Sequence, residues 1–486
     1  MTHLKVLEKI KHIIGEDNFE FLWHFKNYFS AEFFINGLAF LLIPILTRLL
    51  LPEEYGILAV FSSIIAISVI VFKLNLEAAV HRYWFERKKD FDKFLGAVLL
   101  FLTIFNILII PSLYLLRNIF SGFLKISSGL FFAAVLVSFF SIPFQIYLSY
   151  LNSRKLSKRY SLIAIAKKSS VLIISVIWIW ALAENRYLGK VYTMFLIGLL
   201  FFIYTAYCLI KKAKLSFKLK YLKYALLFSV PLIPHTLAGF ILSSFDRIII
   251  QQLTTATKTG LYSFAADVGI LIHIVVLAMN RSWSPMFYER RKNGDYKKID
   301  NLNVNYSKYV YIIALGLVLF AKEIVMIMAD KKYYAALNLL PVIIIGYVFL
   351  FLKSLYAISS FYRRKTGIIS IITLIITGIN IVLNYLFIPI YGYVAAAYTT
   401  LFCYFLFFGF HFVNARFLLK EKVTPLKSLM PNFLLMLLLI GIYFVLKMYI
   451  INFFLLLLIK TALIAFLGYA FFIRKKNYYK KIFRKK

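Results

Sequence analysis

Cysteine is nearly absent from this chain of 486 residues, and so are the short motifs of several enzyme classes. Its two cysteines, Cys208 and Cys403, lie inside apolar runs, where cysteine packs as a small hydrophobic residue more often than it ligates a metal or forms a disulfide. The sequence contains no G-x-x-x-x-G-K-[ST] phosphate loop, no H-E-x-x-H zinc motif and no G-x-S-x-G nucleophile elbow. We therefore expect no ATP motor, no metal centre, no cofactor and no hydrolase site.

Acidic residues are also scarce. The chain has 20 Asp and Glu against 57 Lys and Arg, which gives a formal net charge of +37. Such an excess can indicate nucleic-acid binding. Here no soluble domain collects the basic residues, because they lie in the gaps between apolar runs. Membrane topology and attraction to anionic lipids explain this distribution better, so we expect membrane lipids rather than nucleic acid as partners.

Long apolar runs make up most of the chain, which is 62% hydrophobic with a mean hydropathy of +0.82. Runs of about 20 residues can each cross a bilayer as a helix, which satisfies its backbone groups internally. We therefore predict an all-α integral membrane protein with about 14 transmembrane helices. The predicted spans are 29–51, 55–76, 93–116, 127–151, 161–182, 191–210, 224–250, 260–283, 305–329, 336–360, 368–388, 392–416, 430–450 and 452–473.

Basic residues concentrate in every second gap between these spans. Examples of basic gaps are Arg82–Lys93, Arg154–Arg159 and Lys211–Lys220, whereas Leu51–Glu54 and Pro389–Tyr391 are short and poorer in charge. Because short basic loops stay on the cytoplasmic side, this alternation predicts an even number of spans with both termini in the cytoplasm. No signal peptide is visible before the first span.

The sequence around the first span recurs about 200 residues later. Each copy has proline and arginine in one span, followed by a glycine and a tyrosine that open the next span. These residues are Pro44, Arg48, Tyr55 and Gly56 in the first copy, and Pro231, Pro234, Arg247, Gly260 and Tyr262 in the second. Six spans separate the copies, so the halves run in the same orientation, and such parallel repeats commonly enclose a cavity between two lobes. The predicted parts are an amphipathic N-terminus (1–27), an N-lobe (28–223), a C-lobe (224–418), a final helix pair (419–473) and a basic tail (474–486).

The stretches 44–64 and 229–264 resemble the Wzx-like polysaccharide-biosynthesis flippases of the multidrug/oligosaccharidyl-lipid/polysaccharide exporter superfamily. The resemblance implies two pseudo-symmetric six-helix lobes in a MATE-like V, two C-terminal helices and alternating access. It implies a transporter, not an enzyme, in the bacterial cytoplasmic membrane. The implied cargo is an undecaprenyl-diphosphate-linked glycan, moved from the inner to the outer leaflet for O-antigen, capsule or exopolysaccharide assembly. A polysaccharide polymerase and a chain-length regulator are the implied protein partners.

Charged residues inside spans form the candidate site, because each is costly in lipid unless it faces protein, water or a partner. A diphosphate needs cations that replace its lost hydration. Arginine offers bidentate bonds to phosphate oxygens, and lysine offers a movable point charge. The candidate headgroup-binding residues are Arg48, Arg247, Lys322, Lys353 and Lys73. Each could instead form a structural ion pair or extend to the membrane interface.

Acidic residues and prolines inside spans suggest two further roles. The acidic residues are Asp246, Asp267, Glu323 and Glu32, which could take up H⁺ or Na⁺ during transport or act as standing partners of the cations, the role we favour. The prolines are Pro44, Pro231 and Pro234, which could act as helix hinges or be tolerated passively.

Two other functions are compatible with parts of this pattern. A cation-coupled drug or metabolite exporter of the same superfamily would need coupling carboxylates in the first lobe, where acidic residues inside spans are few. A membrane polysaccharide polymerase or ligase would need a sizeable outer loop with catalytic residues, and the outer gaps here are short. A drug-efflux assay separates the first alternative from a flippase.

Overall fold

The computed structural model describes residues 37–38, 40–450 and 452–473, and these residues contain helices and connecting loops but no β-strand. Thirteen helices are long and apolar enough to cross a membrane, and they overlap the second to fourteenth predicted spans. The all-α prediction is therefore confirmed. The described part of the first predicted span forms a shorter apolar helix, Phe40–Leu49. Glu32, the N-terminal stretch 1–27 and the tail 474–486 lie outside the described residues.

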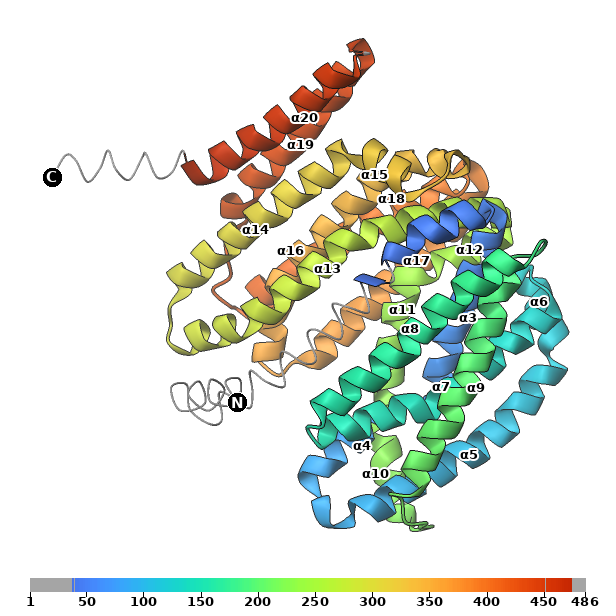
Figure 1. Ribbon diagram of the computed structural model, residues 1–486. Coiled ribbons are helices and arrows are strands. Elements are labelled where there is room, and N and C mark those ends of the chain that lie inside the picture. Colours follow the sequence, from blue (N-terminus) through green and yellow to red (C-terminus); the bar gives the residue numbers. More distant parts are fainter. Residues whose placement is uncertain (1–36, 39, 451, 474–486) are drawn as a thin grey trace, which may run out of the picture. The chain divides into compact units, whose positions relative to one another are not determined.

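The chain divides into two compact units, Met1–Phe240 and Ile241–Lys486, so the division falls inside one helix, α11 (Ile233–Ser244) (Figure 1). The other labelled helices of unit 1 are α3 (Pro52–Lys73), α4 (Leu76–Glu86), α5 (Phe91–Leu115), α6 (Arg117–Leu124), α7 (Ser128–Ser153), α8 (Ser157–Ala181), α9 (Tyr187–Ile210) and α10 (Leu219–Ser229). Those of unit 2 are α12 (Asp246–Leu253), α13 (Ala256–Lys292), α14 (Tyr296–Leu319), α15 (Ala321–Met328), α16 (Leu340–Tyr362), α17 (Thr366–Tyr391), α18 (Val394–Val413), α19 (Leu426–Tyr449) and α20 (Phe453–Gly468).

Helix starts in both units follow from local sequence. Pro52 occupies the first turn of α3, where its missing N–H has no helical partner to lose, and Glu54 accepts the backbone N–H of Leu51 at 3.0 Å. The hydroxyl of Ser127 caps α7, and that of Thr255 caps α13. These devices place the helix starts close to the boundaries expected from the apolar runs.

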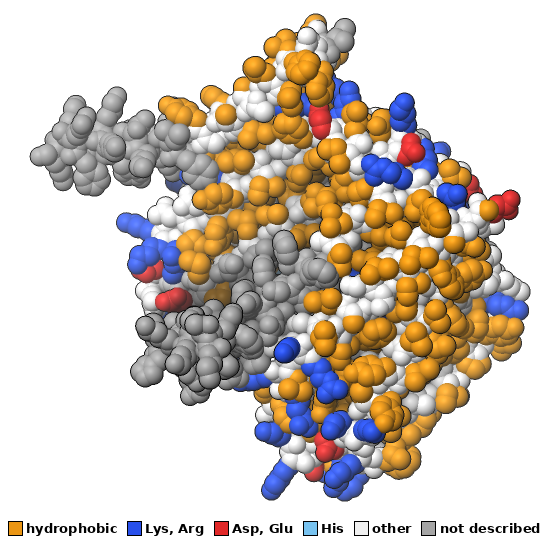
Figure 2. Space-filling view, viewed as in Figure 1, with side chains coloured by type: hydrophobic (Ala, Val, Ile, Leu, Met, Phe, Trp, Pro, Cys, Tyr) orange, Lys and Arg blue, Asp and Glu red, His pale blue; other side chains and the backbone are white. Residues whose placement is uncertain are grey.

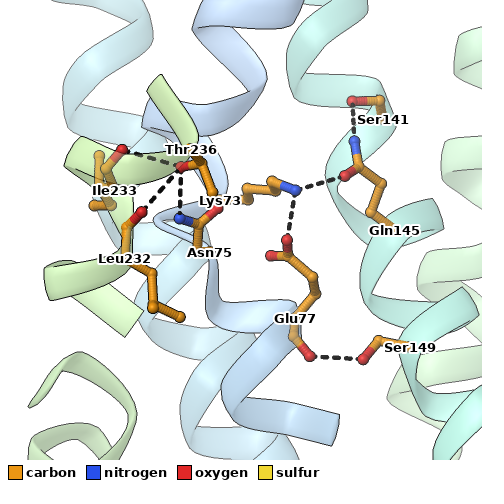
Figure 3. Close-up of polar contacts among 9 residues, drawn as sticks. All are labelled: Lys73, Asn75, Glu77, Ser141, Gln145, Ser149, Leu232, Ile233 and Thr236. Carbon is orange, nitrogen blue, oxygen red and sulfur yellow. Dashed lines mark hydrogen bonds and ion pairs between the residues drawn. The ribbon is translucent and has the colours of Figure 1, made fainter. Parts of the chain in front are cut away.

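A break lies at the end of the predicted span 55–76 (Figure 3). Leu74 and Asn75 adopt left-handed backbone conformations, with φ of 51° and 54°, so α3 ends at Lys73 and a separate helix, α4, begins at Leu76. Asn75 is buried, and its amide donates a hydrogen bond to Thr236 Oγ1 on α11 at 2.9 Å. The Thr236 hydroxyl lies 3.0 Å from the carbonyl of Ile233. This contact joins the break to the start of α11.

The predicted span 224–250 is not one helix. A 3-10 turn, Val230–Leu232, separates α10 from α11, and a second break at Phe245 separates α11 from α12. Pro231 lies in the first break and Pro234 is the second residue of α11. Proline lacks a backbone N–H and so weakens the helical ladder at this point.

Helix α10 packs against α4 through a polar contact as well as aromatic ones. Glu86 accepts hydrogen bonds from the Tyr224 hydroxyl at 2.6 Å and from Arg82 Nε at 2.5 Å. These two donors lower the pKa of the Glu86 carboxyl group below its usual value. The rings of Tyr224 and Tyr83 meet edge to face at 5.0 Å.

Unit 2 has its core between α16, α17 and α18. Cys403 is fully buried beside Phe407, and both pack with Ile376 of α17 and Leu242 of α11. The two cysteines of the chain are free, and Cys403 packs as a small apolar residue.

Ion pairs of Glu421 with Arg291 and Arg363, called the Glu421 clamp below, hold the connector between α18 and α19 in place. Glu421 is 4% exposed, and its carboxylate accepts hydrogen bonds from Arg291 at 2.7 and 2.9 Å and from Arg363. Three residues further along, the Thr424 carbonyl accepts the hydroxyl of Tyr356 at 2.9 Å. The connector is therefore bound to α13 and α16, which fixes where the final helix pair begins.

The surface fits a protein embedded in lipid. On the face shown in Figure 2, hydrophobic side chains cover much of the helices, and Lys and Arg side chains gather mainly toward helix ends. Exposed apolar residues such as Leu162, Ile177 and Trp180 of α8 would face hydrocarbon at no cost.

The packing of α9 on α8 at Gly189 provides a test of this fold. A Cβ atom on Gly189 would lie 2.6 Å from the backbone nitrogen of Ile179 and 2.8 Å from the carbonyl carbon of Trp178. We predict that Gly189→Ala destabilises unit 1 by about 1–3 kcal/mol, because backbone has to move. Gly129, near the start of α7, has no atom within 4 Å of such a Cβ, so Gly129→Ala is the matched control. Thermal melting of the purified variants measures both, and equal melting of the two would contradict the packing.

Candidate functional site

A buried carboxylate organises one end of unit 2. Asp246 is the first residue of α12 and is 2% exposed. One of its oxygens accepts the hydroxyls of Tyr262 (α13) at 2.6 Å and Thr400 (α18) at 2.9 Å. The other accepts the amide of Asn384 (α17) at 2.8 Å. Three neutral donors from three helices therefore replace the water that a carboxylate loses on burial.

The polar network around Asp246 extends along α17 and α18. Asn384 also donates to Asn380 at 3.2 Å, and its carbonyl oxygen accepts the hydroxyl of Thr399 at 2.5 Å. Asn380 donates to Thr400 at 3.4 Å. The sequence prediction missed these residues, although two asparagines four residues apart in an apolar run are a visible signal.

Arg247 and the preceding residue, Asp246, have different partners. Arg247 Nη2 lies 3.2 Å from Asp267 Oδ1 on α13, and the arginine side chain is 15% exposed. Successive helical residues point about 100° apart, which explains why Asp246 and Arg247 have separate partners. The bond to Asp267 uses one of five guanidinium N–H groups, so Arg247 keeps donors for a further contact.

Lys353 lies in the middle of α16 and is half-buried. Its Nζ is 4.3 Å from the centre of the Phe407 ring, and the buried His411 packs against the same ring. Among the residues that the structure describes, no hydrogen bond or ion pair involves Lys353, and neither ring nitrogen of His411 has a hydrogen-bond partner. His273 of α13 stacks on Tyr347, which lies six residues before Lys353 on α16.

In unit 1, Lys73 lies at the break between α3 and α4 (Figure 3). Its Nζ is 2.5 Å from Glu77 Oε1 and 2.9 Å from Gln145 Oε1 on α7. The Glu77 backbone carbonyl accepts the hydroxyl of Ser149 at 2.6 Å. Lys73 is therefore held by a carboxylate and an amide, with α4 extending beyond it.

The remaining sequence candidates lie at the surface or in ion pairs. Arg48 is exposed, and its guanidinium donates to the carbonyl of Pro44 at 3.0 Å. Lys322 is exposed on α15. Its neighbour Glu323 pairs with Lys460 of α20 at 2.5 Å, and Lys460 is 2% exposed. This ion pair fastens the last helix to unit 2.

Two lysines inside a span were missed by the sequence prediction. Lys167 and Lys168 lie in α8, a candidate membrane span, and both are half-buried. Their signal in the sequence is two adjacent charges inside the predicted span 161–182. No group of three or more His, Cys, Asp or Glu within the described part of the chain could hold a metal ion.

Comparisons with known proteins identify a protein family. Residues 26–290 match the family described as polysaccharide biosynthesis protein. Two curated relatives come from Haemophilus influenzae. "Lsg locus putative protein 1" is 27% identical over 54% of this chain, and an uncharacterized membrane protein is 24% identical over 56% of it. The matches span 65% and 66% of those proteins, slightly less than two thirds.

Solved structures share the fold over most of the chain. The lipid II flippase MurJ, in an inward closed conformation, has a TM-score of 0.74 at 16% identity and covers 92% of this chain and 99% of its own. An inward-facing multidrug resistance MATE family transporter has a TM-score of 0.65 at 15% identity, with coverage of 79% and 94%. The predicted fold class is confirmed, and so is the resemblance to polysaccharide-biosynthesis proteins. The chain is a multi-pass membrane protein that belongs to the polysaccharide biosynthesis protein family.

Proposed function

We propose that this protein is a flippase that moves polyprenyl-diphosphate-linked oligosaccharides from the inner to the outer leaflet of the bacterial cytoplasmic membrane. The glycan would serve surface polysaccharide assembly, as O-antigen, capsule or exopolysaccharide. Both termini would lie in the cytoplasm, and a polymerase and a chain-length regulator would act on the delivered glycan. The family match and the fold shared with a lipid II flippase support transport of a lipid-linked sugar.

The observation that carries the proposal is the uncompensated charge of Lys353. A cation inside a span costs several kcal/mol unless it meets a counter-charge, water or a ligand. Lys353 has an aromatic face beside it and no acidic partner in the described residues. An anionic headgroup would supply the missing counter-charge, and a diphosphate is the anionic part of the proposed cargo.

The proposed mechanism uses the remaining donors of Arg247 together with Lys353. Both would bind phosphate or sugar oxygens of the head while the polyprenyl tail stays in the bilayer. Arg48, Lys322 and Lys73 remain candidates for contacts at other stages of transport. Alternating access would come from rocking of two lobes, with the break at Pro231, Pro234 near the start of α11 and Pro44 in the first span as hinges.

In this proposal, Asp246 is the residue that binds the coupling ion. It is the most buried of the acidic candidates described, and its partners are neutral side chains rather than cations. Asp267 and Glu323 each pair with a basic residue, which suits a structural role. A carboxylate surrounded by neutral oxygen-bearing groups can exchange H⁺ or Na⁺ as a transporter changes state.

A cation-coupled drug or metabolite exporter is the second candidate, because multidrug transporters share this fold. It would also use a buried carboxylate. A drug-resistance assay in an efflux-deficient host distinguishes the two, since a flippase would give no resistance but would restore surface polysaccharide to a flippase-null strain.

We predict that Arg247→Ala abolishes complementation of a flippase-null strain at normal expression, because phosphate-binding donors are lost. Asp267→Asn should retain activity, since it removes the ion pair but keeps the guanidinium. If Arg247 served only that ion pair, the two variants would fail equally. The measurement is surface polysaccharide per cell, with membrane protein quantified by immunoblot.

We predict that Lys353→Gln lowers the rate of headgroup translocation at least about tenfold, the effect of one lost charged contact. Lys322→Gln removes an exposed lysine from the same unit and should have a much smaller effect. Translocation of a labelled lipid-linked oligosaccharide into proteoliposomes measures both rates. Comparable rates for Lys353→Gln and the unaltered protein would remove the main support for the proposal.

We predict that Asp246→Asn makes transport independent of imposed H⁺ and Na⁺ gradients, because the amide carries no titratable charge. Asp267→Asn is the control and should keep the gradient dependence of the unaltered protein. Rates in proteoliposomes with each gradient applied in turn measure the effect. Gradient dependence that survives Asp246→Asn would place the coupling elsewhere.

A further inference from the structure

Two lysines in α8 lie deep within a membrane span. Lys167 and Lys168 follow the start of this helix by ten and eleven residues, or about 15 Å at 1.5 Å per residue. That is about half of a hydrocarbon core of about 30 Å. Lysines near the ends of a span can extend to the interface, but a position near the middle does not favour this.

The helical position of Lys168 places it on the side of α8 that faces protein. The buried positions of α8 repeat every three or four residues, as expected for one face of a helix. Six of the seven buried residues lie on this face, namely Ser157, Ser161, Ala164, Leu172, Ser175 and Ile179, and the seventh is Ile163. Lys168 falls four residues after Ala164 and four before Leu172, on this same face. The exposed residues Leu162, Ile173 and Ile177 lie on the opposite side, which would face lipid.

Lys167 turns toward α7. Its Nζ is 3.8 Å from the centre of the Phe144 ring, and Phe144 meets Phe201 of α9 edge to face at 5.9 Å. The next residue of α7, Gln145, accepts a hydrogen bond from Lys73. Lys73 and Lys167 therefore contact α7 at adjacent residues, and so at the same depth along this helix.

No carboxylate offsets these two charges in the described part of unit 1. In its candidate spans, acidic residues lie only within five residues of a helix start: Glu53, Glu54, Asp90 and Asp92. Glu77, the other acidic residue at depth, is bound to Lys73. Neither Lys167 nor Lys168 takes part in a hydrogen bond or ion pair there, and the Phe144 ring attracts a cation without neutralising it.

We propose that Lys167 and Lys168 form an anion-binding site in unit 1 that holds the diphosphate of the lipid-linked cargo. The inference rests on the proposed function and assigns this role to residues outside the repeated motifs. Two ammonium groups supply six N–H donors. Adjacent helical side chains leave the backbone about 100° apart, but each lysine carries its charge on a flexible four-carbon stem, so both ammonium groups can reach one diphosphate. Adjacent like charges repel, and an anion between them removes that cost.

The test is binding of C55 polyprenyl diphosphate to the full-length protein in nanodiscs. Lys167→Gln combined with Lys168→Gln should weaken binding at least about tenfold. The matched control combines Lys158→Gln with Arg159→Gln, which removes two exposed charges from the first turn of α8 and should change affinity less than about twofold. Replacing both lysines by arginine should restore binding, because the charges return.

Several outcomes separate this inference from the proposed function. If the unaltered protein binds uncharged C55 polyprenol as tightly as the diphosphate, the proposed function fails. If it prefers the diphosphate but the paired glutamine variant binds equally well, only the lysine site fails. Competition by phosphatidylglycerol as effective as that by the diphosphate would assign the lysines to bulk lipid and overturn the inference. A lower melting temperature that arginine does not restore would show a structural role and overturn it too.

Discussion

The cost of placing ionised side chains out of water constrains the interior of this protein more than any single contact. Most described charges at depth are matched by a partner that removes this cost. Lys73 binds Glu77, Arg247 binds Asp267, and Lys460 binds Glu323. The Glu421 clamp follows the same rule with two arginines. The Glu323–Lys460 pair and the Glu421 clamp join segments that are distant in sequence, whereas Lys73–Glu77 and Arg247–Asp267 join consecutive helices.

A few charged residues at depth have no oppositely charged partner in the described residues, and these are the residues to which we assign transport. Lys353 in unit 2 and Lys167 in unit 1 lie beside aromatic rings, and neither they nor Lys168 have a described acidic partner. Asp246 is the converse case, a carboxylate held by neutral donors. A protein selected for stability alone would gain by replacing such residues with apolar ones. Their presence in a member of a polysaccharide biosynthesis family fits an anionic cargo and an exchangeable ion.

Helix breaks position several of these groups. The left-handed residues Leu74 and Asn75 end α3 at Lys73, which brings its ammonium group between Glu77 and α7. The break at Phe245 makes Asp246 the first residue of a new helix, where backbone N–H groups favour a negative charge. A continuous helix through either segment would present these side chains in other directions. The positions of Lys73 and Asp246 therefore depend on where the helices end and begin.

The sequence alone determined the helical class, the approximate places of thirteen of the fourteen predicted spans, the family and the two copies of the Pro-Arg motif, because these depend on local hydropathy and on short-range residue patterns. It also marked Lys353 and Arg247 as charges inside spans. Only the tertiary structure decided that Arg247 pairs with Asp267, that Asn384 and Thr400 hold Asp246, and that Lys353 has no described acidic partner. Such pairings join residues as far as 154 positions apart. They depend on which helices pack together, and hydropathy carries no information about that choice.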